Sequence, residues 1–399
     1  MKYLILGAGP SGLTFANRLL QKGIQDFLVL EREEDAGGLC RSRDVDGSPL
    51  DIGGGHFLDV RNEQALTFLL PFMGLEEWDE YERDSRIVVN GNEINSPIES
   101  NIWQMKLNDQ VEYLKSIAVA GCNLGEEMPE KFVDWIFWKL GNKIAEDYMI
   151  PYNQKMFGKD LNRLGTYWLN KLPNVSFEET LISCLEKKAY GKQPAHARFY
   201  YPKKYGYGEI WKRMADALGD RILYKTPVTS IDFDKHLVNG EFSADIIVST
   251  IPWKSIGSFK GMPDEQRERI DSLSYSSVVI TYKPERLKTG AHWIYYPDLS
   301  LPYHRILVRH NFCPDSKGYW TETNLTRFSE AENAGSEYFV NDYAYPLNTM
   351  GKQECMEALL SWAKTRDVYG LGRWGEWQHY NSDIVVSRAL DLADQLSEA

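Results

Sequence analysis

Three glycines near the N-terminus are the first residues whose type and spacing suggest chemistry. Gly7, Gly9 and Gly12 follow the apolar run YLIL in the arrangement GxGxxG. Between a strand and a helix, such glycines allow a tight turn, a close approach of a diphosphate to the backbone, and close packing of the helix on the strand. The helix N-terminus adds free N–H groups and a positive dipole end. A second apolar run ends at Glu31, which suits a hydrogen bond to a ribose hydroxyl, so the pattern predicts a dinucleotide site.

Two further glycine-rich stretches favour FAD over a nicotinamide dinucleotide. In GGLCR, the pair Gly37 and Gly38 is followed by the cation Arg41, which suits a diphosphate that lies deep and a second ring system that crosses the fold. In DIGGGHF, the glycines at 53–55 would let the backbone run against a flat isoalloxazine ring, with His56 beside it. A packed histidine with ordinary hydrogen bonds is the alternative for His56.

The C-terminal segment predicts a helix whose start would serve the same cofactor. Asn381, Ser382 and Asp383 are suitable N-cap residues, and Ile384 and Ala389 are expected on the inner face. A helix N-terminus directed at the N1/O2 edge of a flavin would stabilise the anionic reduced ring. An ordinary capped terminal helix fits the sequence equally well.

A helix-rich stretch at 106–190 interrupts the strands that must position these residues. It carries apolar residues at helical spacing, such as Phe132, Trp135 and Leu140. We expect Pro151 to end this run, because proline cannot donate the backbone hydrogen bond of a helix interior.

Strands return after the helical stretch. Residues 199–208 predict a loop that leads into a helix, whereas RILYKTPVTSID and EFSADIIVSTIP each predict one strand, and residues 275–330 alternate in strand fashion. The predicted fold is α/β, with a discontinuous Rossmann-like FAD-binding domain, an antiparallel-sheet substrate domain and a helical insertion. We assign the FAD-binding domain to residues 1–60, 196–255 and 335–399, the substrate domain to 61–105 and 256–334, and the insertion to 106–195.

Charge and cysteine usage exclude several classes of protein. The 399-residue chain has a formal net charge of −12, which disfavours nucleic acid and anionic membrane surfaces as partners. No apolar run approaches the roughly 20 residues of a membrane span. The five cysteines lack CxxC or CxxH spacing, which indicates a reduced compartment and no metal site. We therefore predict a cytoplasmic protein and leave its oligomeric state open.

As a set, the motifs resemble those of the FAD-dependent amine oxidase and protoporphyrinogen oxidase superfamily, and within it the UDP-galactopyranose mutases. The similarity covers most of the chain. The matching segments occur in the family's order and are GAGPSGL, GGLCRS, GGGHF, IPYNQKMFG, YPKKYGYGEIW, STIP, HWIYYPDLSLPYHR, AYPL and GLGRWGEW.

The resemblance implies a mutase that converts a nucleotide sugar between pyranose and furanose rings, for surface polysaccharide synthesis. In such enzymes N5 of the reduced flavin attacks the anomeric carbon, the nucleoside diphosphate leaves, and the sugar ring opens and recloses on the adduct. The cofactor would be FAD, active when reduced, with NADPH or NADH as reductant. The substrate would be a nucleoside-diphosphate sugar.

The same matching implies roles for individual residues. Arg305 matches the arginine that grips the diphosphate, a task that suits a forked, permanent cation; a surface arginine on a strand is the alternative. Tyr345, with either Tyr380 or His379, would bond phosphate oxygens.

The predicted site residues fall into three groups. The catalytic group is His56, Arg305 and Arg373. The cofactor group is Gly7, Gly9, Gly12, Glu31, Gly38, Leu39, Arg41, Gly54, Gly55, His56, Val228, Arg373, Asn381 and Asp383. The substrate group is Asn153, Phe157, Trp293, Tyr295, Arg305, Tyr345 and Tyr380, in which Asn153 and Trp293 would border the sugar.

Two positions depart from the family's pattern. A second diphosphate arginine is expected about one helical turn past Trp168, where this chain offers Lys171 or Leu172. Ser96 and Glu99 stand where eukaryotic mutases read uracil with tyrosine and glutamine. A carboxylate cannot donate to uracil, but it could accept the paired N–H donors of guanine.

Two other functions compete with the mutase. One is an FAD-dependent oxidoreductase that takes a hydride from an amine or a porphyrinogen-like ring, which has no use for a diphosphate clamp at Arg305. The other is a non-catalytic flavin-binding scaffold, which the missing second arginine supports.

Overall fold

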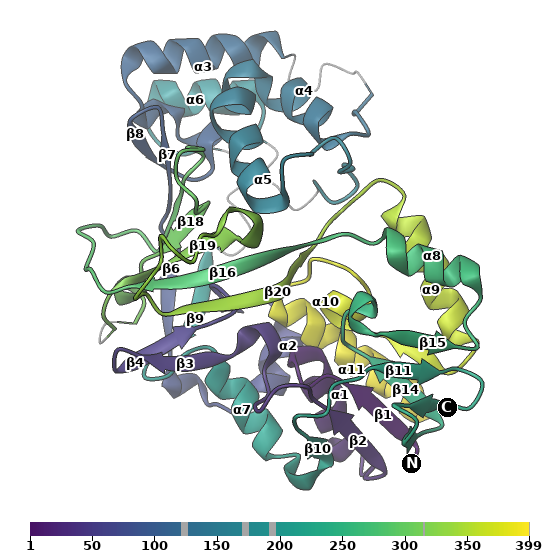
Figure 1. Ribbon diagram of the computed structural model, residues 1–399. Helices are drawn as coiled ribbons and strands as arrows, with labels where there is room; N and C mark the ends of the chain where they lie inside the picture. The colour runs from purple at the N-terminus through teal and green to yellow at the C-terminus, as the bar shows by residue number, and fades with distance from the viewer. Residues whose placement is uncertain (121–126, 170–174, 191–196, 314–315, 399) are drawn as a thin grey trace.

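The chain folds into three parts that Figure 1 shows one above another: a parallel sheet with its helices beside both termini, a long mixed sheet, and a helical segment at the far end. The computed structural model describes residues 1–120, 127–169, 175–190, 197–313 and 316–398. The helices are α1 (Pro10–Gln21), α2 (Glu63–Leu69), α3 (Leu107–Val119), α4 (Phe132–Ile144), α5 (Ile150–Phe157), α6 (Phe177–Glu186), α7 (Gly208–Asp216), α8 (Asp264–Ser272), α9 (Lys352–Lys364), α10 (Gly372–Gly375) and α11 (Ser382–Glu398). Within these ranges, no helix is long and apolar enough to cross a membrane.

The parallel sheet has five strands and confirms the predicted Rossmann-like arrangement. In spatial order they are β10 (Ile222–Leu223), β2 (Phe27–Leu30), β1 (Tyr3–Leu6), β14 (Ile246–Ser249) and β21 (Val368–Gly370). Tyr3 and Ile5 share a buried cluster with α1, whereas Leu4 and Leu6 share another with α9. Because both faces are covered, β1 is apolar at every position.

A small four-stranded sheet lies beside this layer. Its strands are β13 (Phe242–Ser243), β12 (Leu237–Val238), β11 (Ser230–Asp232) and β15 (Ser258–Lys260). The segment RILYKTPVTSID, predicted as one strand, is therefore two, β10 and β11, in different sheets. Between them Lys225 has a positive φ of 54° and Pro227 lacks an N–H, so the chain leaves one sheet and enters the other.

The large sheet has seven strands. In spatial order they are β20 (Tyr338–Pro346), β16 (Tyr275–Lys283), β19 (Tyr319–Asn324), β18 (Arg305–Leu307), β17 (Trp293–Tyr295), β7 (Ser85–Val89) and β8 (Asn92–Asn95). All neighbours are antiparallel except β17 and β7. Residues 338–346 pair in this sheet and not in the parallel sheet, although residues 340–343 also line the cavity described below, and β15 pairs with β11 in the four-stranded sheet. The domain boundaries stay a prediction.

Two small sheets join the layers. The hairpin β3 (Ser42–Val45) and β4 (Ser48–Asp51) is one; the other has β5 (Leu58–Asp59), β9 (Arg198–Pro202) and β6 (Trp78–Glu82). The expected loop at 199–208 is wrong for its first residues, because β9 pairs with β5 on one side and β6 on the other. Phe199 and Tyr201 are buried in this strand.

The helical segment is α3 to α6. Phe132, Trp135 and Leu140 are buried on α4 as predicted. Pro151 does not end the helical run: a π-helical turn at Ala145–Met149 joins α4 to α5, and Pro151 is the second residue of α5, directly after this turn. On α11, Ala389 is buried as expected, but Ile384 is 38% exposed.

Asp51 ties the hairpin to β9 and α7. Its carboxylate accepts hydrogen bonds from the Ser42 hydroxyl (2.6 Å), the Tyr201 hydroxyl (2.8 Å) and the Tyr207 backbone N–H (3.0 Å). The side chain is fully buried, and this burial raises the Asp51 pKa to about 6 although all three donors act to lower it.

Asp51→Asn should remove a pH dependence of stability between about pH 4 and pH 6. The Asp51 pKa rises from 3.8 to about 6 on folding, so the folded protein holds this proton more tightly in that interval. The resulting stability is fully present below the unfolded pKa and is lost as the pH rises through the folded one. Thermal unfolding across this interval should show the melting temperature of the wild type falling relative to that of the variant. A difference in melting temperature between the two proteins that does not change with pH would contradict this role of Asp51.

Candidate functional site

A cavity of about 690 Å³ lies at the carboxyl ends of β1, β2 and β14. Ligands of open α/β sheets bind at such edges, and pockets for cofactors measure roughly 300–1,000 Å³. Of the predicted cofactor group, the following line the cavity: Gly7, Gly9, Glu31, Gly38, Leu39, Arg41, His56, Val228 and Arg373. Tyr380, predicted for the substrate, lines it as well.

The three glycines of the first turn serve different purposes. Gly7 has a φ of +99°, which favours glycine. A Cβ on Gly12 would overlap the carbonyl oxygen of Gly7, so this glycine is needed for helix–strand packing. A Cβ on Gly9 would meet nothing closer than the Gly38 Cα at 3.9 Å and would project beside the N-terminus of α1. Gly9 therefore leaves a cradle for a ligand, as the motif predicts.

Glu31 and Arg41 face the same cavity. The Glu31 carboxylate accepts two backbone hydrogen bonds, one from Ala8 (2.7 Å), and burial raises its pKa. The Arg41 guanidinium donates to the Gly38 carbonyl (2.9 Å) and to the Asp35 carboxylate (3.2 Å). These contacts hold both side chains in place at the cavity wall.

The glycine run at 53–55 makes room for the protein itself. A Cβ on Gly53 would overlap the Leu39 backbone, and a Cβ on Gly55 would overlap the Leu307 side chain. Gly54 has a φ of +103°. The run lets the loop pack closely against Leu39 and Leu307, and His56 at its end lines the cavity. That the run also borders a flavin ring stays a prediction.

His56 and Arg373 place a neutral ring and a cation at the cavity wall. Burial, together with the nearby Arg373 cation, lowers the His56 pKa to about 4, so the imidazole is neutral at pH 7. Since the Gly54 carbonyl 2.9 Å from Nδ1 can only accept, Nδ1 carries the proton and Nε2 is an acceptor. Burial lowers the pKa of Arg373, whose guanidinium donates to the Tyr380 carbonyl from Nε (3.0 Å) and Nη2 (2.8 Å).

Arg305 and Glu322 form an ion pair beside this loop, in which Glu322 is fully buried and the Arg305 side chain is 17% exposed. The Arg305 Nε donates to a Glu322 oxygen (2.6 Å), and its Nη2 donates to the Tyr345 hydroxyl (3.1 Å). Burial acts to raise the Glu322 pKa, but Arg305 outweighs it and the pKa falls to about 2. Glu322 also accepts the Gly55 N–H (3.3 Å), so the pair contacts the loop that ends at His56.

Tyr295 extends this polar group along the sheet. It pairs directly with Arg305 across β17 and β18, and its hydroxyl accepts a hydrogen bond from Arg83 Nη2 (2.8 Å). Burial acts to raise the Tyr295 pKa, but Arg83 and then Arg305 outweigh it, so the pKa lies below the ordinary value. The Tyr152 ring of α5 lies 5.6 Å from the Tyr295 ring.

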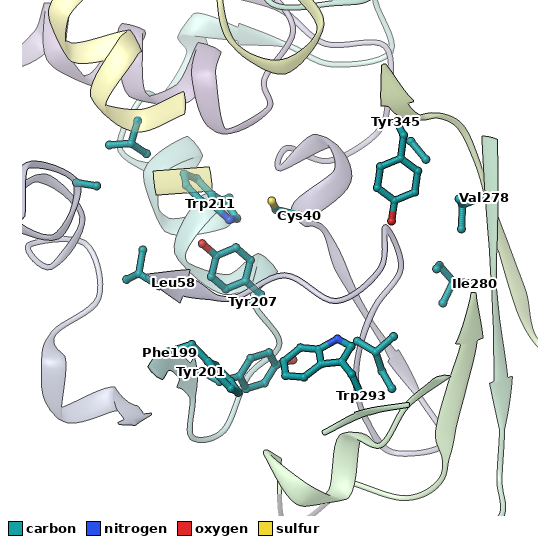
Figure 2. Packing of buried hydrophobic residues seen from close by; sticks show 14 of the residues in the cluster. Cys40, Leu58, Phe199, Tyr201, Tyr207, Trp211, Val278, Ile280, Trp293 and Tyr345 are labelled. Atoms are coloured by element: carbon teal, nitrogen blue, oxygen red, sulfur yellow. The ribbon is translucent and has the colours of Figure 1, made fainter. Parts of the chain in front are cut away.

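The other predicted substrate residues lie in different settings. Phe157 contacts the Tyr345 ring edge-on (6.4 Å). Asn153 is buried and donates to the Met149 carbonyl (2.6 Å) within its own helical run. Trp293 is 2% exposed, and its ring centre lies 5.4 Å from that of Phe199, so it is chiefly a core residue. Figure 2 shows both side chains within the buried cluster.

Several predicted residues lie outside the cavity wall. They are Gly12, Gly54, Gly55, Asn381 and Asp383. At the start of α11 the residue that lines the cavity is Ser382. The Asp383 carboxylate accepts a hydrogen bond from the Asn62 amide (3.3 Å). Glu99 is nearly buried just after Pro97, and burial raises its pKa. Lys171 and Leu172 lie outside the described residues. The ligand contacts of all these residues stay predictions.

Sequence reasoning missed Glu322, Arg83 and Tyr152. No local pattern marks Glu322, because its importance arises from the register that places it opposite Arg305 on β19. The signal that could have found it is the alternation of strand residues, but only once the strand pairing is known.

The residues of the cavity wall fit an FAD molecule by their chemistry. Its wall offers an open position at Gly9, the N-terminus of α1, a carboxylate at Glu31 and a cation at Arg373. These are the groups that a diphosphate, a ribose and an electron-rich ring would meet.

Comparisons with known proteins agree with this geometry. The family model described as flavin containing amine oxidoreductase matches residues 10–282. A Klebsiella pneumoniae protein named "Probable UDP-galactopyranose mutase" is 23% identical over 400 residues, which cover 98% of this chain and 94% of that protein.

Two solved structures share the fold. A crystal structure of reduced UDP-galactopyranose mutase has a TM-score of 0.89 at 22% identity and covers 100% of this chain and 94% of its own. Cyclohexylamine oxidase from Brevibacterium oxydans IH-35A has a TM-score of 0.69 at 18% identity, with 100% and 98% covered. These similarities confirm the predicted fold class.

Gly9→Val should abolish FAD binding and leave the fold intact, because its side chain would occupy the open cradle and Gly9 has an ordinary φ of −78°. Gly12→Ala should instead destabilise the protein, since its Cβ has no room against Gly7. Flavin absorbance of the purified proteins, together with thermal unfolding, separates the two effects. If the purified Gly9→Val protein still shows flavin absorbance, the FAD diphosphate does not lie against Gly9.

Proposed function

Because the chain belongs to the flavin containing amine oxidoreductase family, we propose that it is an FAD-dependent mutase that interconverts the pyranose and furanose rings of a nucleotide sugar. The family makes the chain an FAD-dependent enzyme, either a mutase or an oxidoreductase. The observation that favours the mutase is the Arg305–Glu322 pair with Tyr345, beside the loop that ends at His56.

Arg305 is suited to hold a diphosphate. Glu322 accepts the hydrogen bond of Nε. The Nη1 and Nη2 groups form the end of the guanidinium away from Nε, and Nη2 already donates to the Tyr345 hydroxyl. Burial acts to lower the Arg305 pKa, but Glu322 and the neighbouring tyrosines outweigh it, so the pKa lies well above its ordinary value and the cation is permanent. A fixed cation with a fork of donors stabilises the negative charge that a departing nucleoside diphosphate acquires.

The cofactor-side residues have a separate task. A reduced flavin, when bound, supplies the nucleophile for the anomeric carbon. Arg373 lines the cavity as a cation held by carbonyls, which favours an electron-rich, anionic ring beside it. His56, neutral and fixed by Gly54, presents Nε2 as an acceptor for a hydroxyl or N–H proton at the same wall.

The oxidoreductase is the second candidate, because the family model matches residues 10–282 and the cyclohexylamine oxidase structure covers 100% of this chain. It predicts that an amine reduces the flavin and that oxygen is then consumed. We propose further that the mutase acts in the cytoplasm, takes electrons from NADPH or NADH, and serves surface polysaccharide synthesis.

Arg305→Ala should weaken binding of a nucleoside diphosphate to the dithionite-reduced protein by ~1.5–3 kcal/mol, or roughly tenfold to hundredfold, because a charged hydrogen-bond donor is lost. Arg305→Lys should recover part of the affinity, since the ammonium keeps the charge but loses the fork. Flavin fluorescence titrations with UDP and GDP measure both effects.

The flavin absorbance of both variants serves as the control, since Arg305 is not part of the cofactor cavity wall. The mutase proposal fails if neither nucleotide binds the reduced wild-type protein. It also fails if Arg305→Ala binds both nucleotides as tightly as the wild type does while an amine reduces the flavin, and the oxidoreductase then takes its place.

A further inference from the structure

Arg83 lies just before β7 with its guanidinium held on two sides. Nε donates to the Ser85 hydroxyl (2.7 Å) and Nη2 donates to the Tyr295 hydroxyl (2.8 Å). Its Cζ atom lies 4.8 Å from the centre of the Trp293 ring and 5.7 Å from that of Phe57. The side chain is therefore fixed in direction by hydrogen bonds and by two aromatic rings.

No carboxylate lies within 4 Å of Arg83 in the described part of the chain, and Nη1 has no partner there. Arg86, three residues later, makes an instructive contrast. Its guanidinium pairs with the Asp84 carboxylate (2.9 Å) and with the Glu93 carboxylate (2.7 Å). A half-buried guanidinium that keeps three N–H groups, two of them on Nη1, and no counter-charge is arranged for an anion that is not part of the protein.

Arg83 and Arg305 flank the same loop. Arg305 reaches it through Glu322, which accepts the Gly55 N–H, and Arg83 reaches it through Phe57. His56, which lines the cofactor cavity, lies between these two contact points. Tyr295 lies between the two cations, because its hydroxyl accepts a hydrogen bond from Arg83, Arg305 is its partner on β18, and both arginines act to lower its pKa.

We propose that Arg83 binds a carboxylate on the sugar, so that the substrate is a nucleoside-diphosphate uronic acid. This inference rests on the proposed mutase function. If Arg305 holds the diphosphate, the sugar is the part of the ligand next to the cofactor. We assign the anion at Arg83 to the sugar, because Arg83 contacts Phe57, the residue after His56 of the cavity wall. A carboxylate matches the guanidinium because its two oxygens accept parallel N–H donors.

The test compares acidic and neutral sugars on the dithionite-reduced holoenzyme by flavin fluorescence. The probes are UDP-galacturonic acid against UDP-galactose, and GDP-mannuronic acid against GDP-mannose. In at least one pair, the acidic sugar nucleotide should bind roughly tenfold or more tightly than the neutral one. This is the difference in affinity expected from one charged hydrogen bond. Arg83→Gln should remove this difference and leave the affinity for the free nucleotide unchanged, and Arg83→Lys should keep part of it.

Arg86→Gln is the matched control, because Arg86 lies three residues after Arg83 and is already neutralised by Asp84 and Glu93, so this variant should keep the preference. Flavin content and melting temperature show whether each variant is folded. Equal affinity for acidic and neutral sugars, or an Arg83→Gln protein that still prefers the acid, would overturn this inference alone. If no nucleotide or nucleotide sugar binds, or if binding does not depend on Arg305, the proposed function itself fails.

Discussion

Glu322 is a fully buried carboxylate on which the geometry of the candidate site depends. It accepts a hydrogen bond from Arg305 on the neighbouring strand and another from the Gly55 N–H in the loop that carries His56. An isolated buried carboxylate would be strongly unfavourable, so the pair and the loop must form together. One side chain thereby fixes the direction of a cation and the distance between the seven-stranded sheet and the cofactor cavity.

The site divides its charges between two regions. At the cavity wall, the Arg373 guanidinium is held by carbonyl oxygens and forms no ion pair with a carboxylate of the described residues, and His56 on the same wall is neutral. On the sheet, Arg305 is neutralised by Glu322, and Arg83 is not neutralised by any described residue. The arrangement suits a ligand that carries its own negative charges and lies across the loop between the two regions.

Glycines recur at the site for two physical reasons. Gly9 leaves space that a ligand would fill, whereas Gly12, Gly53 and Gly55 leave space that other protein atoms already fill. The first kind decides what can bind, and the second decides how closely helix, loop and sheet approach each other. Both kinds look alike in a sequence, since each is only a residue without a side chain.

The sequence by itself determined the nucleotide turn and the fold family, because Gly7, Gly9, Gly12 and Glu31 lie in one continuous strand–turn–helix–strand unit and act through local geometry. It also marked Arg305 and Tyr345 through their motifs. Only the tertiary structure decided that residues 198–202 form a strand, that Glu322 faces Arg305, and that Arg83 donates to Tyr295, the partner of Arg305 on β17. These contacts depend on the register between strands far apart in the chain, and a shift of one residue would turn each side chain to the opposite face.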